Sequence, residues 1–218
     1  MVVRRGKALC AAAVLSLCSV VCAAANAAAD FVGERASDDA RYAANWVLES
    51  GDHQGQPFAI VDKRDARIYV FEPQGRVIGA SPVLIGLAPG DLSVPDISRR
   101  TPGSLLPMER TTPAGRFNTE PGHNDKGEDI VWVDYEASLA IHRLRPAPVT
   151  ERRSERLASQ TAADHRISFG CVVVPVEFYE RIVASTLGKR RGVVYVLPES
   201  RPASDMFGAL ELSASAAP

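Results

Sequence analysis

The segment ISFGCVVVP, residues 167–175, is the most informative part of this chain of 218 residues for its fold. It places Cys171 directly after Gly170 and before an apolar run that ends at Pro175. Glycine permits a sharp backbone path, and proline suits the first turn of a helix. The pattern therefore predicts a thiol on a strand-to-helix segment, followed by a helix over residues 175–187.

On both sides of this segment, short apolar runs alternate with turn residues, which predicts a mainly β fold with short helices. Apolar runs at 58–62 and 67–71, followed by the turn EPQG at 72–75, are typical of an antiparallel meander. Ser37 can cap a helix over 37–49. Further strands are expected at 76–81, 83–85, 128–135, 138–142 and 193–197, and a short helix at 150–159.

Residues 86–110 differ from this pattern because they contain four prolines and few periodic apolar positions. A long surface loop is expected there. Loops of this length are uncommon unless they form a lid or the wall of a binding site. The alternative is a disordered insertion.

The N-terminus has the three parts of a secretory signal peptide. Arg4, Arg5 and Lys7 precede an uncharged stretch over 8–25, and the small residues of Ala25-Asn26-Ala27 follow. We therefore expect residues 1–27 to be cleaved and the protein to be exported to the periplasm or cell envelope. The alternative is a membrane anchor.

Cleavage would leave Cys171 as the one cysteine of the mature chain. Exported proteins normally pair their cysteines or lack them, so a solitary thiol indicates a reactive group. The alternative is a buried cysteine that acts as a small hydrophobic residue.

A reactive thiol needs a base that takes its proton. The spacing of the sequence alone does not choose among the four histidines, but His142 lies at the end of a predicted strand, which would hold it rigidly. Backbone N–H groups around Gly170 and Cys171 could face a developing oxyanion. The four histidines are His53, His123, His142 and His165.

The composition does not indicate a nucleic-acid partner. Hydrophobic residues make up 46% of the chain, enough for a globular core, and the formal net charge is −1. Such a balance shows no basic footprint for nucleic acid.

Three motifs in order, TPAGRF at 112–117, IH at 141–142 and SFGCV at 168–172, resemble the L,D-transpeptidase catalytic domain, the YkuD family. The resemblance implies a mixed β-sheet sandwich over residues 58–198. The remaining divisions are a signal peptide over 1–27, an N-terminal helical extension over 28–57 and a loose C-terminal tail over 199–218.

The resemblance also implies roles for individual residues. Cys171 matches the nucleophile, His142 matches its base, and the backbone carbonyl of Arg143 matches the group that orients the imidazole. Ser168 and Gly170 match the rest of the active-site turn, with the Gly170 backbone N–H as a catalytic donor.

The implied reaction is acyl transfer from a peptidoglycan stem tetrapeptide, with release of D-Ala. The acceptor would be an amine of a second stem peptide or of an outer-membrane lipoprotein. No metal and no organic cofactor is implied.

The chain departs from the family pattern in places. Phe169 stands where the family has a second histidine, and Val173 stands where it has Asn or Arg. We expect Arg166 and Phe169 to contact substrate. The longer spacer before Cys171 carries an arginine cluster that would either clamp substrate carboxylates or form a solvated basic loop. The cluster is Arg143, Arg145, Arg152, Arg153 and Arg156.

Other functions remain open at this stage. An L,D-carboxypeptidase or hydrolase would use the same cysteine and histidine with water as acceptor. A non-catalytic peptidoglycan-binding protein would keep the fold without the chemistry. A papain-like protease should have neighbours of the cysteine that this chain lacks.

Overall fold

Most of the strands that the sequence predicts are present in the computed structural model, which describes residues 28–207. They form a five-stranded sheet in the order β3-β2-β1-β11-β5 and a four-stranded sheet in the order β10-β8-β7-β6, while β4 pairs with β9. The strands are β1 Phe58–Asp62, β2 Arg67–Phe71, β3 Val77–Pro82, β4 Ile85–Gly86, β5 Gly115–Asn118, β6 Glu120–His123, β7 Asp129–Asp134, β8 Leu139–Arg143, β9 Arg166–Ser168, β10 Val172–Val174 and β11 Val193–Val196.

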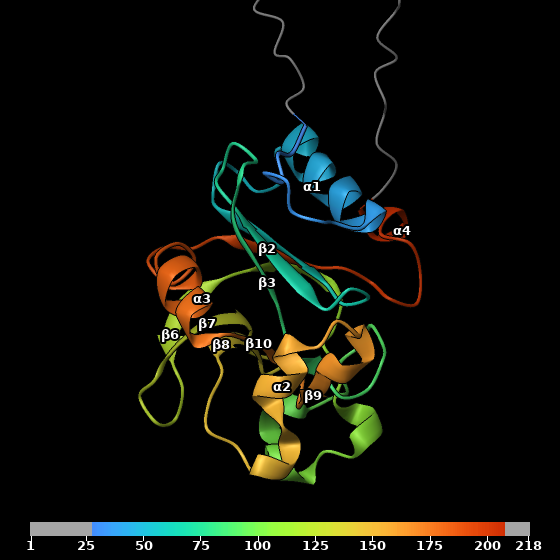
Figure 1. Ribbon diagram of the computed structural model, residues 1–218, viewed down its shortest axis with the longest axis vertical. Coiled ribbons are helices and arrows are strands. Elements are labelled where there is room, and N and C mark those ends of the chain that lie inside the picture. Colours follow the sequence, from blue (N-terminus) through green and yellow to red (C-terminus); the bar gives the residue numbers. More distant parts are fainter. Residues whose placement is uncertain (1–27, 208–218) are drawn as a thin grey trace, which may run out of the picture.

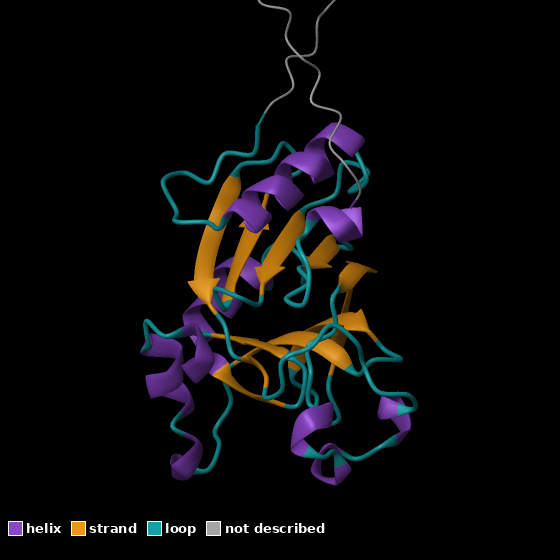
Figure 2. Ribbon diagram, turned by 90° about the vertical axis from the view of Figure 1, so that its right-hand side faces the viewer, coloured by secondary structure: helices purple, strands orange, loops and turns teal. Residues whose placement is uncertain are grey.

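The expected antiparallel meander is confirmed for β1, β2 and β3. Two later strands enter the sheets in parallel, β11 beside β1 and β10 beside β8. The result is a mainly β fold of mixed sheets with short helices, as predicted, and Figure 2 shows the larger two sheets as stacked layers. Sheets with mixed pairing are common when one strand arrives by a long crossover.

Alternating side chains of the five-stranded sheet face two separate cores, because successive residues of a strand point to opposite faces. Ala59 and Val61 of β1 pack with residues of the four-stranded sheet such as Val131 and Ile141. Their neighbours in β1, Phe58 and Ile60, lie in the other core, under helix α1. The five-stranded sheet is therefore covered on both faces.

Helix α1, Asp38–Ser50, lies across the five-stranded sheet (Figure 1). It begins after Ser37, whose hydroxyl accepts the Ala40 N–H at 3.0 Å, and it ends at Gly51, which adopts the left-handed conformation. The cap by Ser37 is the predicted one, and the helix lies within a residue of the predicted range. Because α1 shares a core with β1 and β2, the N-terminal extension belongs to the same folded body as the sheets.

The other helices are short. Helix α2 spans Arg153–Ala158, within the predicted range. The predicted helix over 175–187 begins as α3, Val176–Phe178, and continues as the π-helical turn η6, Tyr179–Val183. Loop 86–110 contains three 3₁₀ turns, and further short turns flank α2. These turns are η1 Ile97–Arg99, η2 Pro102–Ser104, η3 Pro107–Glu109, η4 Val149–Glu151 and η5 Ala162–His165.

The expectation of a loose tail from residue 199 is wrong for residues 199–207. Glu199 accepts the Gly90 N–H at 2.7 Å, and helix α4, Ser204–Phe207, packs on α1. The Phe207 ring lies 5.2 Å from the Trp46 ring. The sequence of this segment is rich in Ala, Ser and Pro and therefore did not predict these contacts, which Glu199 and Phe207 make.

Two parts of the prediction lie outside the described residues, namely the signal peptide over 1–27 and the end of the tail over 208–218. Within residues 28–207, no helix is long and apolar enough to cross a bilayer.

Candidate active site

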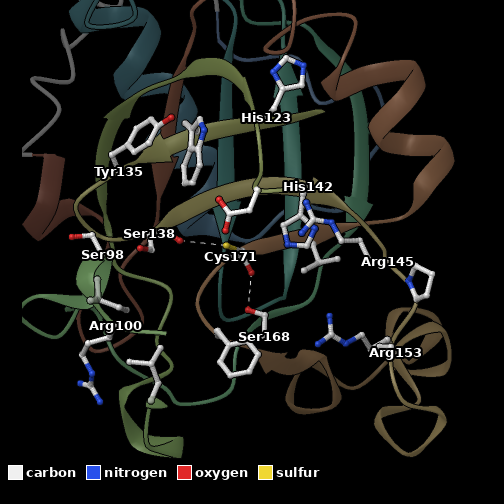
Figure 3. A pocket seen from close by; sticks show the side chains of 18 of the residues that line it. Ser98, Arg100, His123, Tyr135, Ser138, His142, Arg145, Arg153, Ser168 and Cys171 are labelled. Atoms are coloured by element: carbon white, nitrogen blue, oxygen red, sulfur yellow. Dashed lines mark hydrogen bonds between the residues drawn. The ribbon is translucent and has the colours of Figure 1, made fainter. Parts of the chain in front are cut away.

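Cys171 lies between β9 and β10, and β10 leads through Pro175 into α3. Its side chain lines a cavity of about 740 Å³ between the four-stranded sheet, loop 86–110 and the spacer before α2 (Figure 3). The loop contributes Ile97, Ser98 and Leu105 to the lining. Residues 86–110 thus form a wall of this cavity.

His142 and Cys171 face the same cavity because of the register between β8 and β10. These strands run parallel, with His142 opposite Val173. Cys171 precedes Val173 by two residues, so both point to the same face of the sheet as His142. All three residues line the cavity. The sheet therefore brings together the histidine and the thiol that sequence spacing alone could not connect.

The His142 ring is fixed by the neighbouring carbonyl. Its Nδ1 lies 2.8 Å from the Arg143 backbone oxygen. A carbonyl oxygen only accepts hydrogen bonds, so Nδ1 carries the proton and Nε2 of the neutral ring keeps its lone pair. This contact is the one that the family resemblance implied for Arg143.

Burial lowers the pKa of His142 to about 4, and the charges of Arg145 and Arg153 act in the same direction. The imidazole is therefore neutral around pH 7 and able to accept a proton. Of the other histidines, His53 and His165 have both ring nitrogens on backbone carbonyls. His123 lies at the cavity but pairs with Asp129.

The Cys171 thiol is protonated at rest. Burial raises its pKa, although the Ala140 backbone N–H and the charge of Arg145 oppose this effect. The thiol donates to the Ser138 carbonyl with a sulfur–oxygen distance of 3.4 Å. A neutral thiol and a neutral imidazole in one cavity require the base to act during the reaction, rather than a preformed ion pair.

Side-chain and backbone hydrogen bonds hold the turn that presents Cys171. The Ser168 hydroxyl donates to the Cys171 carbonyl at 2.7 Å and accepts the Gly170 N–H at 3.1 Å. The Gly170 N–H is thus occupied, contrary to the expectation that it would face substrate. Gly170 itself has φ +139°, and a Cβ there would lie 2.8 Å from the Thr111 carbonyl oxygen, so the turn requires glycine.

Thr112 connects this turn to the rest of the protein. Its hydroxyl donates to the Gly170 carbonyl at 2.7 Å and accepts the Gly86 N–H at 2.9 Å. The residue is buried. The first position of the TPAGRF motif therefore supports the Cys171 turn directly, a contact that sequence analysis did not identify.

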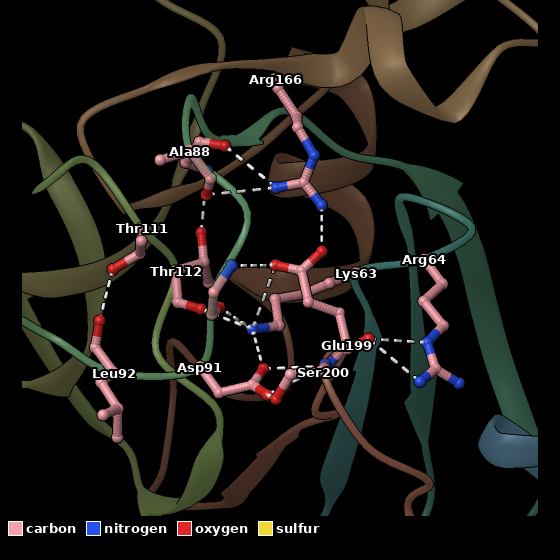
Figure 4. Close-up of polar contacts among 12 residues, drawn as sticks. Lys63, Arg64, Ala88, Asp91, Leu92, Thr111, Thr112, Arg166, Glu199 and Ser200 are labelled. Atoms are coloured by element: carbon pink, nitrogen blue, oxygen red, sulfur yellow. Dashed lines mark hydrogen bonds and ion pairs between the residues drawn. The ribbon is translucent and has the colours of Figure 1, made fainter. Parts of the chain in front are cut away.

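Behind Thr112 lies a buried charge cluster of Lys63, Asp91, Arg166 and Glu199 (Figure 4). The Lys63 side chain is 0% exposed, and its Nζ donates to the Asp91 carboxylate at 2.8 Å and to the Thr112 carbonyl at 2.9 Å. Burial alone would raise the pKa of Asp91, but hydrogen bonds from Lys63 and Ser200 hold it below its usual range. Lys63 follows a strand at a turn, where a lysine normally indicates a solvated surface, so no sequence signal pointed to this role.

The prediction that Arg166 binds substrate is wrong. Its guanidinium pairs with Glu199 and donates to the carbonyls of Gly86 and Ala88, each at 3.3 Å. Arg166 therefore points into the buried charge cluster and does not line the cavity. Arg166 shares β9 with Ser168, which does line the cavity. Its guanidinium nevertheless pairs with Glu199, 33 residues further along the chain, and nothing in the local sequence indicated this partner.

Phe169, the other predicted substrate contact, does line the cavity and is 36% exposed. The Arg110 guanidinium lies 4.6 Å above its ring, a cation–π arrangement that fixes the ring. Arg145 and Arg153 of the spacer line the cavity as well. Among residues 28–207, no group of three or more potential ligands could hold a metal ion.

Comparisons with known proteins give likenesses at the level of solved structures only. No family model matches the chain, and no curated protein does. Among solved structures, the chain is similar to an L,D-transpeptidase from Xylanimonas cellulosilytica, with TM-score 0.38, 18% identity and coverage of 69% of this chain and 67% of that one.

Two further structures are similar to a comparable degree. The catalytic domain of the L,D-transpeptidase from E. faecium gives TM-score 0.37 and 16% identity, covering 66% of this chain and 98% of that one. The helical cell shape determining protein Pgp2 from Campylobacter jejuni gives TM-score 0.41 and 14% identity, covering 72% and 55%. The chain spans about half to two thirds of the first structures that it matches.

Proposed function

We propose that this protein is an exported peptidoglycan L,D-transpeptidase with Cys171 as its nucleophile. The observation that carries the proposal is the shared cavity of Cys171 and His142, in which the Arg143 carbonyl holds the imidazole with Nε2 unprotonated. Residues 1–27 would direct export and be removed. The substrates would be stem peptides of peptidoglycan.

In the first step, His142 Nε2 accepts the thiol proton as Cys171 Sγ attacks the carbonyl carbon of the donor peptide. The thiol first turns away from Ser138, to which it donates at rest. Because the Gly170 N–H is held by Ser168, we assign the oxyanion donor to the Cys171 N–H. The tetrahedral intermediate collapses, His142 returns the proton to the leaving amine, and a thioester remains as D-Ala departs.

In the second step, an amine of another stem peptide or of a lipoprotein attacks the thioester. His142 accepts the amine proton and returns it to the sulfur as the new amide forms, which restores the resting thiol. Water in place of the amine would give the carboxypeptidase outcome with the same residues. Analysis of the products formed on purified sacculi distinguishes a new cross-link from a shortened stem.

The test of the proposal is intact-mass analysis after incubation with a carbapenem. We expect one adduct of the full carbapenem mass, because opening of the lactam ring releases no leaving group. Cys171→Ala should give no adduct, and His142→Gln should form it about 10²–10⁴ times more slowly. His165→Gln is the matched control, since that ring bonds only to backbone carbonyls. A wild-type protein that stays unmodified, or a Cys171→Ala variant that is modified equally, overturns the proposal.

A further inference from the structure

The cavity has a basic wall on the His142 side. Arg145 and Arg153 both line it, and Figure 3 shows them on the side of Cys171 where His142 lies, with Arg100 on the opposite side. Both guanidinium groups lie close enough to His142 to lower its pKa. The wall is thus within reach of a molecule that is bound at the thiol.

The two arginines keep their terminal nitrogens free of protein partners within the described residues. Arg145 approaches Glu128 through Nε at 2.9 Å, and Arg153 approaches Glu151 through Nε. No other hydrogen bond or ion pair of either guanidinium is formed to residues 28–207. Arg153 Nε donates a hydrogen bond to Glu151, whereas Arg145 Nε is buried without a hydrogen-bond partner in the described part of the chain and meets Glu128 as an ion pair alone. On both side chains the paired terminal N–H groups that suit a carboxylate remain open.

Arg100 lacks this property. Both of its terminal nitrogens already bind the Glu109 carboxylate, at 2.9 and 2.8 Å. Asp125 is the acidic residue of the cavity lining, whereas Glu128 and Glu151, which pair with the two arginines, do not line it. The open guanidinium nitrogens therefore form the cationic part of this wall. Anion binding is therefore expected at Arg145 and Arg153 and not on the opposite wall.

We propose that Arg145 and Arg153 form a carboxylate subsite beside Cys171, which binds a free carboxylate of the acyl donor and makes acidic peptides the preferred substrates. The identity of the ligand as a peptide donor rests on the proposed function. The subsite itself requires only a thiol at residue 171 that reagents can reach. It takes the role that the sequence suggested for Arg166.

The test compares two thiol reagents that differ only by a carboxylate, N-ethylmaleimide and 3-maleimidopropionate. In both, the thiolate adds to the carbon–carbon double bond, a proton is taken up at the adjacent carbon, and nothing leaves. Their rate ratio at one pH cancels any change in the thiolate fraction. We expect the wild-type ratio to favour the anionic reagent about tenfold or more relative to a small free thiol.

The double variant Arg145→Gln/Arg153→Gln should bring the ratio to that of the free thiol, while N-ethylmaleimide still reacts and thereby reports a folded, reachable site. Arg152→Gln is the matched control, because it removes the same charge from a side chain that is 68% exposed and does not line the cavity.

An unchanged ratio in the double variant overturns the subsite, and an equal fall in Arg152→Gln assigns the effect to general surface charge and overturns it too. Loss of the carbapenem adduct with the ratio preserved would refute the proposed function alone.

Discussion

Arg166 and Arg153, two arginines near Cys171, have opposite environments. Arg166 is closed within the buried charge cluster, where a carboxylate and two carbonyls occupy its guanidinium. Arg153 is equally buried, since each side chain is 16% exposed, yet its one partner contacts Nε alone. The difference shows that burial does not separate a structural arginine from a binding one. The number of terminal nitrogens that the protein leaves unpaired does.

The largest expected effect comes from opening the buried charge cluster. Lys63→Met removes the cation between Asp91 and Glu199, and breaking a buried pair from one side costs about 3–5 kcal/mol of the free energy of unfolding. Chemical denaturation measures this. Arg181→Gln is the control, because its pair with Glu177 involves a side chain that is 77% exposed and should contribute less than about 1 kcal/mol. Equal losses of stability in the two variants would contradict the distinction between the buried charge cluster and an exposed ion pair.

Acid should destabilise the protein through His142, which lines the cavity. Its pKa is lowered from 6.5 to about 4 in the folded protein, so the unfolded chain binds the proton first as the pH falls. Above pH 6.5 this group has no effect, and between pH 6.5 and 4 the free energy of unfolding should fall by about 3 kcal/mol. Denaturation at several pH values measures the slope. If His142→Gln keeps the full slope, another group is responsible.

The two arginines give the direct test of the comparison. Arg166→Gln removes charge-assisted hydrogen bonds inside the cluster and should cost about 2–3 kcal/mol of the free energy of unfolding. Arg153→Gln should cost less, because it removes one charge-assisted hydrogen bond where Arg166→Gln removes three, although the two side chains are equally exposed. Denaturation of both variants at pH 7 measures the two costs. Equal costs would show that the number of paired terminal nitrogens does not determine what an arginine contributes to stability.

The smallest effect is expected at the connection between the two regions. Thr112→Val leaves the Gly170 carbonyl and the Gly86 N–H without the hydroxyl, at a cost of about 1–2 kcal/mol. It should also change the rate at which N-ethylmaleimide modifies Cys171. Thr119→Val is the matched control, because it loses a similar buried hydrogen bond to Gly192 away from the cavity. Both variants should lose stability, and only the first should change the alkylation rate.

Patterns along the chain were enough to predict the local elements and the reactive pair of residues. Short continuous apolar runs bounded by turn residues predicted β1, β2 and β11 to within a residue or two, because these strands are buried on both faces. Cys171 was singled out by counting, and His142 by its place at a strand end together with the family resemblance. These are properties of neighbouring residues, which a linear pattern retains.

Which charged side chains meet could be seen only in the folded protein. Arg166 pairs with Glu199, a residue 33 positions away, and Lys63 contacts Thr112 across 49 positions. The partner of a charge depends on chain crossings that no local pattern encodes. The same crossings order residues 199–207, turn Arg166 away from the thiol, and leave Arg145 and Arg153 open to the cavity. Whether a guanidinium is paired or left open therefore depends on which carboxylate the fold brings to it.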